Sequence, residues 1–363
     1  MKERDTLSKI QPYKPGKTPS QMKALYSGDD YLKLSSNENV LGPPKTVKES
    51  LQKTLHDIAL YPDKNQLIEA LSNEFAIPKD HIIIGNGSDE VLLGAGLAYL
   101  NPGDQVISST QTFSQYRFIA DVLDAEYYEA PMTNDRYDLT AITKAVTPKT
   151  KLIFIANPNN PTGTIITQSE LRSFMNDIPE TCLIVLDEAY QEYATHPEYP
   201  QTVGLYKHHS NILITRTFSK LYGLAGLRVG YGISNEAVIR QIRKTQQPFN
   251  VNQIALSSAR LALSDKDHIK ESIKLNTNGK SYLYNELNKL NLTYIDTQAN
   301  FILIDLPISG DLMFDHLCKK GIIVRSLSSF GRPNAIRVTI GTQSQNERFI
   351  NALTTIIKEL DYE

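Results

Sequence analysis

Cysteine and long apolar runs are both scarce in this chain. Its 363 residues include two cysteines, Cys182 and Cys318, which lie too far apart in sequence to suggest a disulfide framework or a metal-binding spacing. Apolar runs such as Cys182 to Leu186 are much shorter than the roughly 20 residues of a membrane-spanning helix. The first five residues are mostly charged, and no apolar segment of a secretory signal follows them. We therefore expect a cytoplasmic protein that holds no metal.

An excess of charge of either sign is also absent. Lys plus Arg number 38 and Asp plus Glu number 40, which gives a formal net charge of -2. Binding to nucleic acid or to a membrane surface usually needs a strong basic excess. The composition, 40% hydrophobic and 21% charged, is ordinary for a soluble globular protein. We expect small-molecule substrates and neither a nucleic-acid nor a membrane partner.

Short β-branched runs alternate with segments of helical length through the middle of the chain. These runs are Ile82 to Ile84, Gln105 to Ser108, Lys151 to Ile155, Cys182 to Leu186, Asn211 to Thr215 and Val229 to Ile233. Continuously apolar strands are typical of a mostly parallel sheet that is buried on both faces. We predict an α/β fold, with a three-layer α/β/α large domain over residues 46–265 and a smaller α+β domain over residues 266–363. Residues 1–45 would form an arm and the start of the small domain.

The stretch from Thr215 to Gly232 contains a lysine with the surroundings of a phosphate site. Lys220 follows an apolar strand and lies beside the hydroxyls of Thr217 and Ser219, and Arg228 follows in a glycine-rich segment. Arginine recognises phosphate through a planar fork of donors. Pyridoxal phosphate needs both a phosphate site and a lysine amine, with which it forms a Schiff base. The alternative is a lysine on a glycine-rich surface loop, with the arginine in an ion pair.

Other polar groups also follow strands, where ligands of parallel sheets collect. The turn Gly85 to Glu90 joins a strand to a helix, with Ser88 as the expected N-cap, and could bind an anion or be a plain connection. The loop Asn157 to Gly163 is stiffened by two prolines and could equally be a simple turn. Asp187 ends a buried strand, where a carboxylate needs a positive partner such as a protonated pyridine nitrogen. The alternative role for Asp187 is capping the helix after it.

The predicted small domain carries polar residues at its strand ends. Asn300 precedes a strand, Arg325 follows another, and Arg337 lies within a third. A single arginine is usually a surface residue. Two arginines that lead toward one cleft, in a chain that already has an anion site, favour binding of an anionic substrate.

Taken together, these residues resemble the fold type I, pyridoxal-phosphate aminotransferases over nearly the whole chain. The motifs that carry the resemblance are Ser36 to Asn39, Gly85 to Glu90, Asn157 to Gly163, Asp187 to Tyr190, and Thr217 to Lys220 with Arg228. The pattern is most similar to the histidinol-phosphate aminotransferase subgroup, for which Tyr61 to Asp63 and Leu224 to Gly230 are typical.

The resemblance implies a role for each matching position. Lys220 would hold the cofactor and move the substrate proton, with Asp187 and Tyr190 as further catalytic residues. The implied cofactor-binding residues are Ser88, Asp89, Phe113, Asn160, Asp187, Tyr190, Thr217, Ser219, Lys220 and Arg228, with Tyr61 reaching in from a second subunit of a homodimer. The implied substrate-binding residues are Tyr13, Asn39, Asn300, Arg325 and Arg337.

The implied reaction is transamination between histidinol phosphate and 2-oxoglutarate, in histidine biosynthesis. Two alternatives on the same scaffold stay open, an aromatic amino-acid aminotransferase and an O-phospho-amino-acid decarboxylase. A third hypothesis, a non-catalytic protein with this fold, predicts loss of Lys220 or Asp187, and both are present.

Overall fold

The computed structural model describes residues 1, 3–10, 12, 17–26 and 30–360. A seven-stranded sheet has the strand order β2-β10-β9-β8-β7-β3-β4. Its strands are β2 (Ile82–Gly85), β3 (Gln105–Ser109), β4 (Glu126–Ala130), β7 (Thr150–Ala156), β8 (Leu183–Asp187), β9 (Ile212–Thr217) and β10 (Gly230–Ile233). Only β10 is antiparallel to its neighbours in this sheet, so the predicted mostly parallel sheet is confirmed.

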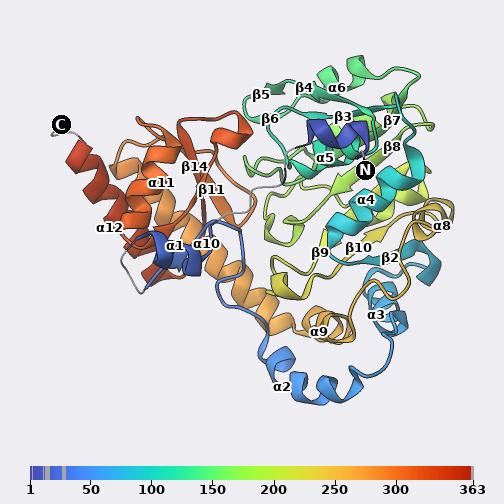
Figure 1. The fold of residues 1–363 in the computed structure, drawn as a ribbon, viewed down its shortest axis with the longest axis horizontal. Helices are drawn as coiled ribbons and strands as arrows, with labels where there is room; N and C mark the ends of the chain where they lie inside the picture. The colour runs from blue at the N-terminus through green and yellow to red at the C-terminus, as the bar shows by residue number, and fades with distance from the viewer. Residues whose placement is uncertain (2, 11, 13–16, 27–29, 361–363) are drawn as a thin grey trace.

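Both faces of this sheet are buried under helices (Figure 1). Within β7, Ile153 and Ile155 belong to one apolar core, and Leu152 and Phe154 belong to the core on the opposite face. The first core is completed by α3 (Asn65–Phe75), α6 (Leu139–Ala145), α7 (Gln168–Asp177) and α9 (Gln253–Ser264). The second is completed by α4 (Ser88–Tyr99), α5 (Gln115–Val122) and α8 (Glu236–Arg243). The predicted three-layer α/β/α arrangement is therefore confirmed.

A separate apolar core forms around a second, smaller sheet. That sheet is antiparallel, with the order β11-β14-β13. Its elements are β11 (Phe301–Asp305), β13 (Arg325–Ser326) and β14 (Ala335–Thr339), covered by α11 (Gly310–Lys319) and α12 (Gln343–Leu360). Beside it, β1 (Leu32–Lys33) pairs in parallel with β12 (Ile322–Ile323). The predicted smaller α+β unit is present, and an early segment of the chain joins it.

One long helix, α10 (Lys266–Lys289), runs from one core to the other (Figure 1). Ile269 and Ile273 near its start pack against the large-sheet core, while Leu283 and Leu287 are fully buried in the small-sheet core. A helix that carries apolar residues along its whole length can contact both cores in this way. We propose that the boundary between the large and the small domain lies between residues 265 and 266.

The remaining elements lie at the edges of these two units. Among them are η1 (Asp5–Lys9), α1 (Pro19–Leu25), α2 (Lys45–Thr54), and the hairpin of β5 (Met132–Thr133) and β6 (Arg136–Tyr137). In α1, Pro19 occupies the start of the helix, where a missing N–H costs nothing, and Thr18 caps it. Among the described residues, no helix has the length and apolar character to cross a bilayer.

Candidate active site

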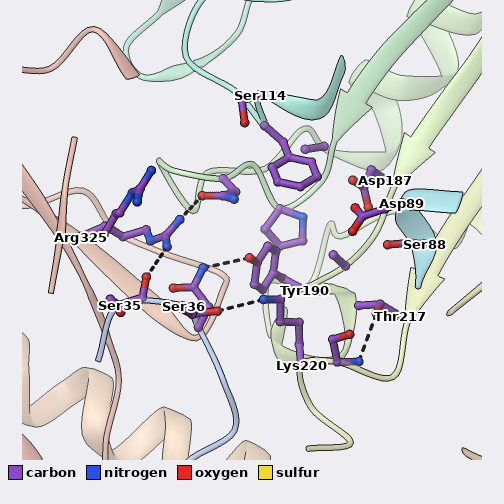
Figure 2. Close-up of a pocket in the computed structure, with 18 of the residues that line it drawn as sticks. Ser35, Ser36, Ser88, Asp89, Ser114, Asp187, Tyr190, Thr217, Lys220 and Arg325 are labelled. Carbon is purple, nitrogen blue, oxygen red and sulfur yellow. Dashed lines mark hydrogen bonds between the residues drawn. The ribbon is translucent and has the colours of Figure 1, made fainter. Parts of the chain in front are cut away.

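A cavity of about 260 Å³ lies where the carboxyl ends of the large-sheet strands face the small sheet (Figure 2). Residues of the large-sheet unit and residues of the small-sheet unit both line it. Of the residues singled out from sequence, those that line it are Ser88, Asp89, Phe113, Asn160, Asp187, Tyr190, Thr217, Ser219, Lys220, Arg228, Arg325 and Arg337. Segments separated by more than two hundred residues therefore meet in one pocket.

Asp187 is the last residue of β8 and is 5% exposed. Its Oδ2 accepts a hydrogen bond from the Tyr116 hydroxyl at 2.8 Å. Its Oδ1 is buried and has no hydrogen-bond partner among the described residues. Burial raises the pKa of Asp187 from 3.8 to about 6, since the charged form loses its hydration. The helix that follows, η4 (Gln191–Tyr193), has Tyr190 and not Asp187 as its N-cap, so the geometry favours a ligand with a positive donor.

Lys220 lies in the turn that follows β9. Its Nζ donates to the Ser36 carbonyl at 3.0 Å and lies 5.5 Å from the centre of the Tyr190 ring. Figure 2 shows this amine between the Ser36 segment and Tyr190. The Tyr190 hydroxyl accepts from Asn37 Nδ2 at 2.9 Å. An amine and a phenol thus point into the same pocket.

The cationic end of the pocket is built at the start of α4. Gly87, with φ of 76°, is the N-cap, and Ser88 is the first helical residue, so the expectation that Ser88 would be the N-cap was wrong. Any Cβ at Gly87 would lie 2.6 Å from Arg228 Nη2, which shows how closely the guanidinium approaches this turn. Arg228 bonds Ser219 Oγ at 3.2 Å and Asp89 Oδ2 at 3.0 Å. Hydroxyls, a helix N-terminus and a guanidinium together form an anion cradle.

Arg337 connects the two sides of the pocket. It extends from β14 and is 6% exposed. Its Nη1 donates to Asn160 Oδ1, and its Nη2 donates to the Ser35 carbonyl at 2.8 Å. Because Oδ1 of Asn160 accepts from Arg337, the NH₂ of Asn160 is the group that can donate into the pocket. Arg325 lines the same side, away from Asp187 (Figure 2).

Three predicted residues that the structure describes are not part of this lining. Asn39 is outside it, and its amide instead donates to the Leu221 carbonyl at 2.6 Å. Asn300 is buried behind the pocket and donates to the Asn37 carbonyl at 3.0 Å, which orients Asn37 toward Tyr190. Tyr61 is 80% exposed and stacks on Phe249. Tyr13 lies outside the described residues.

Comparison with known proteins decides the family. The family model for aminotransferase class I and II matches residues 29–353. This chain belongs to the class I and II aminotransferases. It is 44% identical over 357 residues to a histidinol-phosphate aminotransferase of Moorella thermoacetica, covering 98% of this chain and 92% of that protein. A protein of the same name from Geobacillus sp. is 43% identical, covering 99% of each.

A solved structure shares the architecture of this aminotransferase. The histidinol-phosphate aminotransferase from Sinorhizobium meliloti, solved in complex with pyridoxal-5'-phosphate, superposes with a TM-score of 0.89 at 25% identity. The match covers 98% of this chain and 97% of that one.

Sequence reasoning did not assign a role to two residues that support the site of this aminotransferase. Tyr116, fully buried, stacks on Phe154 at 4.7 Å and donates to Asp187, so it fixes one carboxylate oxygen. It is the second residue of α5, and its ring meets that of Phe113, which precedes the helix, at 5.7 Å. Asn37 lines the pocket and donates to Tyr190, whereas the Ser36 to Asn39 motif had predicted Asn39 as the binding residue.

Behind the pocket lies a buried ion pair that joins β8 to β9. Arg216 Nη2 lies 2.8 Å from Glu188 Oε2, and both side chains are nearly inaccessible to solvent. Burial also raises the pKa of nearby Glu192 to about 7. Glu188 and Arg216 each directly adjoin a pocket residue in sequence, namely Asp187 and Thr217. The pair therefore holds together the two strand ends that carry those residues. Within the described residues, no three side chains of His, Cys, Asp or Glu gather as a metal site.

Proposed function

We propose that this aminotransferase uses pyridoxal 5'-phosphate to exchange an amino group between histidinol phosphate and 2-oxoglutarate. The products would be imidazole acetol phosphate and glutamate, a step of histidine biosynthesis. The observation that supports the cofactor is that one pocket holds both the Lys220 amine and a buried Asp187 oxygen to which no described residue donates a hydrogen bond. Support for the substrate comes from relatives called histidinol-phosphate aminotransferases at 39–44% identity over nearly the full chain.

The pocket residues fit that cofactor at each of its polar ends. Asp187 Oδ1 would accept from the protonated ring nitrogen, and the charge of the ring would stabilise the ionised carboxylate. Tyr190 and the NH₂ of Asn160 would hydrogen-bond the ring hydroxyl. Phe113 would stack on the ring, retaining its contact area without a hydroxyl. The phosphate would bind at Ser88, the Asp89 amide, Thr217, Ser219 and Arg228.

The chain itself supplies acid–base chemistry and orientation. Once bound, pyridoxal phosphate provides the carbonyl carbon that takes the amino group and the ring that withdraws electrons from the reacting carbon. Lys220 Nζ would first accept the proton of the substrate α-carbon and then return it on the cofactor side. Tyr116 would keep Asp187 oriented, since its hydroxyl already donates to Oδ2.

Arg337 is our proposed binding group for the anion near the reacting carbon. In histidinol phosphate this anion is a phosphate, and in glutamate it is a carboxylate. A planar guanidinium can bind either in a forked geometry. Arg325 would contact the outer oxygens, and Tyr13 stays a prediction from the sequence. One site that serves the amino donor and then the amino acceptor is what a ping-pong reaction requires.

The visible spectrum of the purified protein tests the function. We expect the band of the lysine-bound cofactor to disappear with histidinol phosphate and to return with 2-oxoglutarate. If only phenylalanine or tyrosine removes the band, the aromatic alternative replaces our substrate. Release of carbon dioxide from threonine phosphate would favour the decarboxylase. A protein that shows no band after addition of cofactor would refute the cofactor proposal.

We also propose a homodimer in the cytoplasm, with Tyr61 completing the phosphate site of the neighbouring subunit. Its support is an exposed apolar group near α2: Leu55, Ile58, Leu60 and Tyr61 are each at least 50% exposed. Such a cluster is typical of a protein interface. The dimer is tested by sedimentation of the wild-type and Tyr61→Ala proteins and by their cofactor affinities. The location is tested by fractionation of the source cells.

A further inference from the structure

Asn39 joins three segments of the chain at a point just outside the pocket. It is partly buried, and its Nδ2 donates to the Leu221 carbonyl at 2.6 Å and to Ser272 Oγ of α10 at 2.8 Å. His268 Nε2, also on α10, lies 3.5 Å from the same nitrogen. On the other side, Asn39 Oδ1 accepts from the Leu41 amide at 3.0 Å. Both ends of this amide are therefore engaged by the protein.

The Leu221 carbonyl belongs to the peptide unit directly after Lys220. Leu221 itself is fully buried, so its carbonyl needs a donor. Within this turn, Gly223 N bonds the Lys220 carbonyl and Leu224 N bonds the Phe218 carbonyl, each at 3.0 Å. Among the described residues, no backbone N–H donates to Leu221 O; Asn39 Nδ2 donates to it, and His268 also hydrogen-bonds the Leu221 backbone.

The turn that contains Asn39 also packs directly on the lysine turn. Gly42 N bonds the Asn39 carbonyl at 2.9 Å, which closes the first turn. Gly223 in the second turn has φ of 67°, and a Cβ there would lie 2.2 Å from the Gly42 carbonyl. With backbone packed on backbone, a shift of one turn must move the other.

The same segment holds the lysine at a second point. Lys220 Nζ donates to the Ser36 carbonyl, three residues before Asn39. The segment is itself anchored to the small sheet, because Leu34 O accepts from the Thr339 amide at 2.8 Å. The lysine turn is thus fixed by a segment whose other contacts lie in the small-sheet unit.

We propose that Asn39 is a positioning residue for Lys220, acting through the Leu221 carbonyl, and not a substrate contact. This inference rests on the proposed function, since that function gives the Lys220 amine its role. The amide of Asn39 sets the orientation of the peptide unit after Lys220 and thereby the direction in which the amine approaches the cofactor carbonyl carbon. Misplacing a reacting group by about 1 Å can cost roughly 100-fold in rate.

Asn39→Asp is the deciding variant because it keeps the size of the side chain and replaces the donor with an acceptor. A carboxylate cannot donate to the Leu221 carbonyl and repels it. Ser272→Ala removes the neighbouring partner and keeps the contact to Leu221. Thr46→Val is the matched control, because the Thr46 hydroxyl links α2 to Asp265 at the start of α10 at 2.8 Å, on the exposed surface.

Two rates are measured for each variant. The first is the appearance of the visible band when cofactor-free protein meets saturating pyridoxal phosphate, which reports capture of the cofactor by Lys220 without turnover. The second is kcat, with KM, for histidinol phosphate. For Asn39→Asp we expect both capture and kcat to fall about 10- to 100-fold with KM within about twofold. Both rates should fall less for Ser272→Ala, and for Thr46→Val both rates should equal those of the wild-type protein.

Results other than the expected ones lead to different conclusions. Unchanged capture and kcat per folded molecule, even with a lower Tm, would reduce Asn39 to a structural residue and overturn the inference. A higher KM with unchanged kcat and capture would make Asn39 a substrate contact, as the sequence suggested. A wild-type protein without a band would refute the proposed function first. Should Asn39→Asp not fold, Asn39→Ala, which removes the donor without adding a charge, provides the same comparison.

Discussion

Replacing Asp187 by asparagine should stabilise the cofactor-free protein while removing its activity. The ionised carboxylate is buried, with one oxygen bonded to Tyr116 and the other without a partner in the described structure. Asparagine has nearly the same shape, and its Oδ1 can still accept from the Tyr116 hydroxyl. The substitution therefore removes the cost of burying a charge and retains the existing hydrogen bond.

The size of this effect follows from the pKa of Asp187. In the folded protein the pKa is about 6, against an ordinary value of 3.8. The folded state therefore holds its proton more tightly than the unfolded chain does. Stability falls as pH rises from 3.8 through about 6, and the full loss at pH 8 is about 3 kcal/mol. At pH 5 roughly half of that loss remains.

Unfolding of cofactor-free wild-type and Asp187→Asn proteins at pH 8 and pH 5 measures this loss. With an unfolding entropy of about 2 cal/mol/K per residue, 3 kcal/mol corresponds to a rise of about 4 °C in Tm at pH 8. The gain should shrink at pH 5. Asp177→Asn, at an exposed carboxylate, is the control. A gap between the two proteins that is the same at both pH values would refute the reasoning.

Three other substitutions test the site and its support. Lys220→Ala should lower turnover more than about 100-fold with the fold intact, as seen by steady-state rates and circular dichroism, and retained turnover would contradict its role. Arg337→Ala should raise KM for both histidinol phosphate and 2-oxoglutarate about 10- to 100-fold, because each loses a charge-assisted hydrogen bond; a change for one substrate alone would argue against a shared anion site. Glu188→Ala should destabilise the protein by about 3–5 kcal/mol in denaturant unfolding, since it leaves Arg216 buried without its ion pair. Glu129→Ala, which breaks an exposed pair, should cost at most about 1 kcal/mol, and equal losses would contradict the role of burial.

The sheet was predictable because its central strands are apolar on both faces. A run such as Lys151 to Ile155 carries that signal in its own residues, without knowledge of its neighbours. The edge strand β4, Glu126 to Ala130, was not predicted because much of it faces solvent. Its two glutamates made the sequence resemble a loop. Its place at the edge depends on pairing with β3, and that pairing is not encoded in five residues.

Within the site, strand-end motifs were easier to assign than supporting residues. Asp187 stood out because a carboxylate after a buried strand needs a partner. Tyr116 and Asn37 act through hydrogen bonds to residues 71 and 153 positions away in sequence. The choice between Asn37 and Asn39 depended on which way the loop turns. Asn37 has φ of 57°, a left-handed conformation that asparagine tolerates, and no spacing rule reveals it.

Arg337 places a condition on how the site can work. Its guanidinium bonds the Asn160 amide from the large unit and the Ser35 carbonyl from the segment that also holds Lys220. A substrate anion that binds Arg337 must share or replace these contacts, so it acts on both groups at once. Asn160 is the proposed hydrogen-bond donor to the ring hydroxyl of the cofactor, and Ser36, next to Ser35, accepts from the Lys220 amine. We therefore propose that binding of the substrate anion and placement of the reacting amine are coupled through this side chain, and we expect Arg337→Ala to change kcat as well as KM.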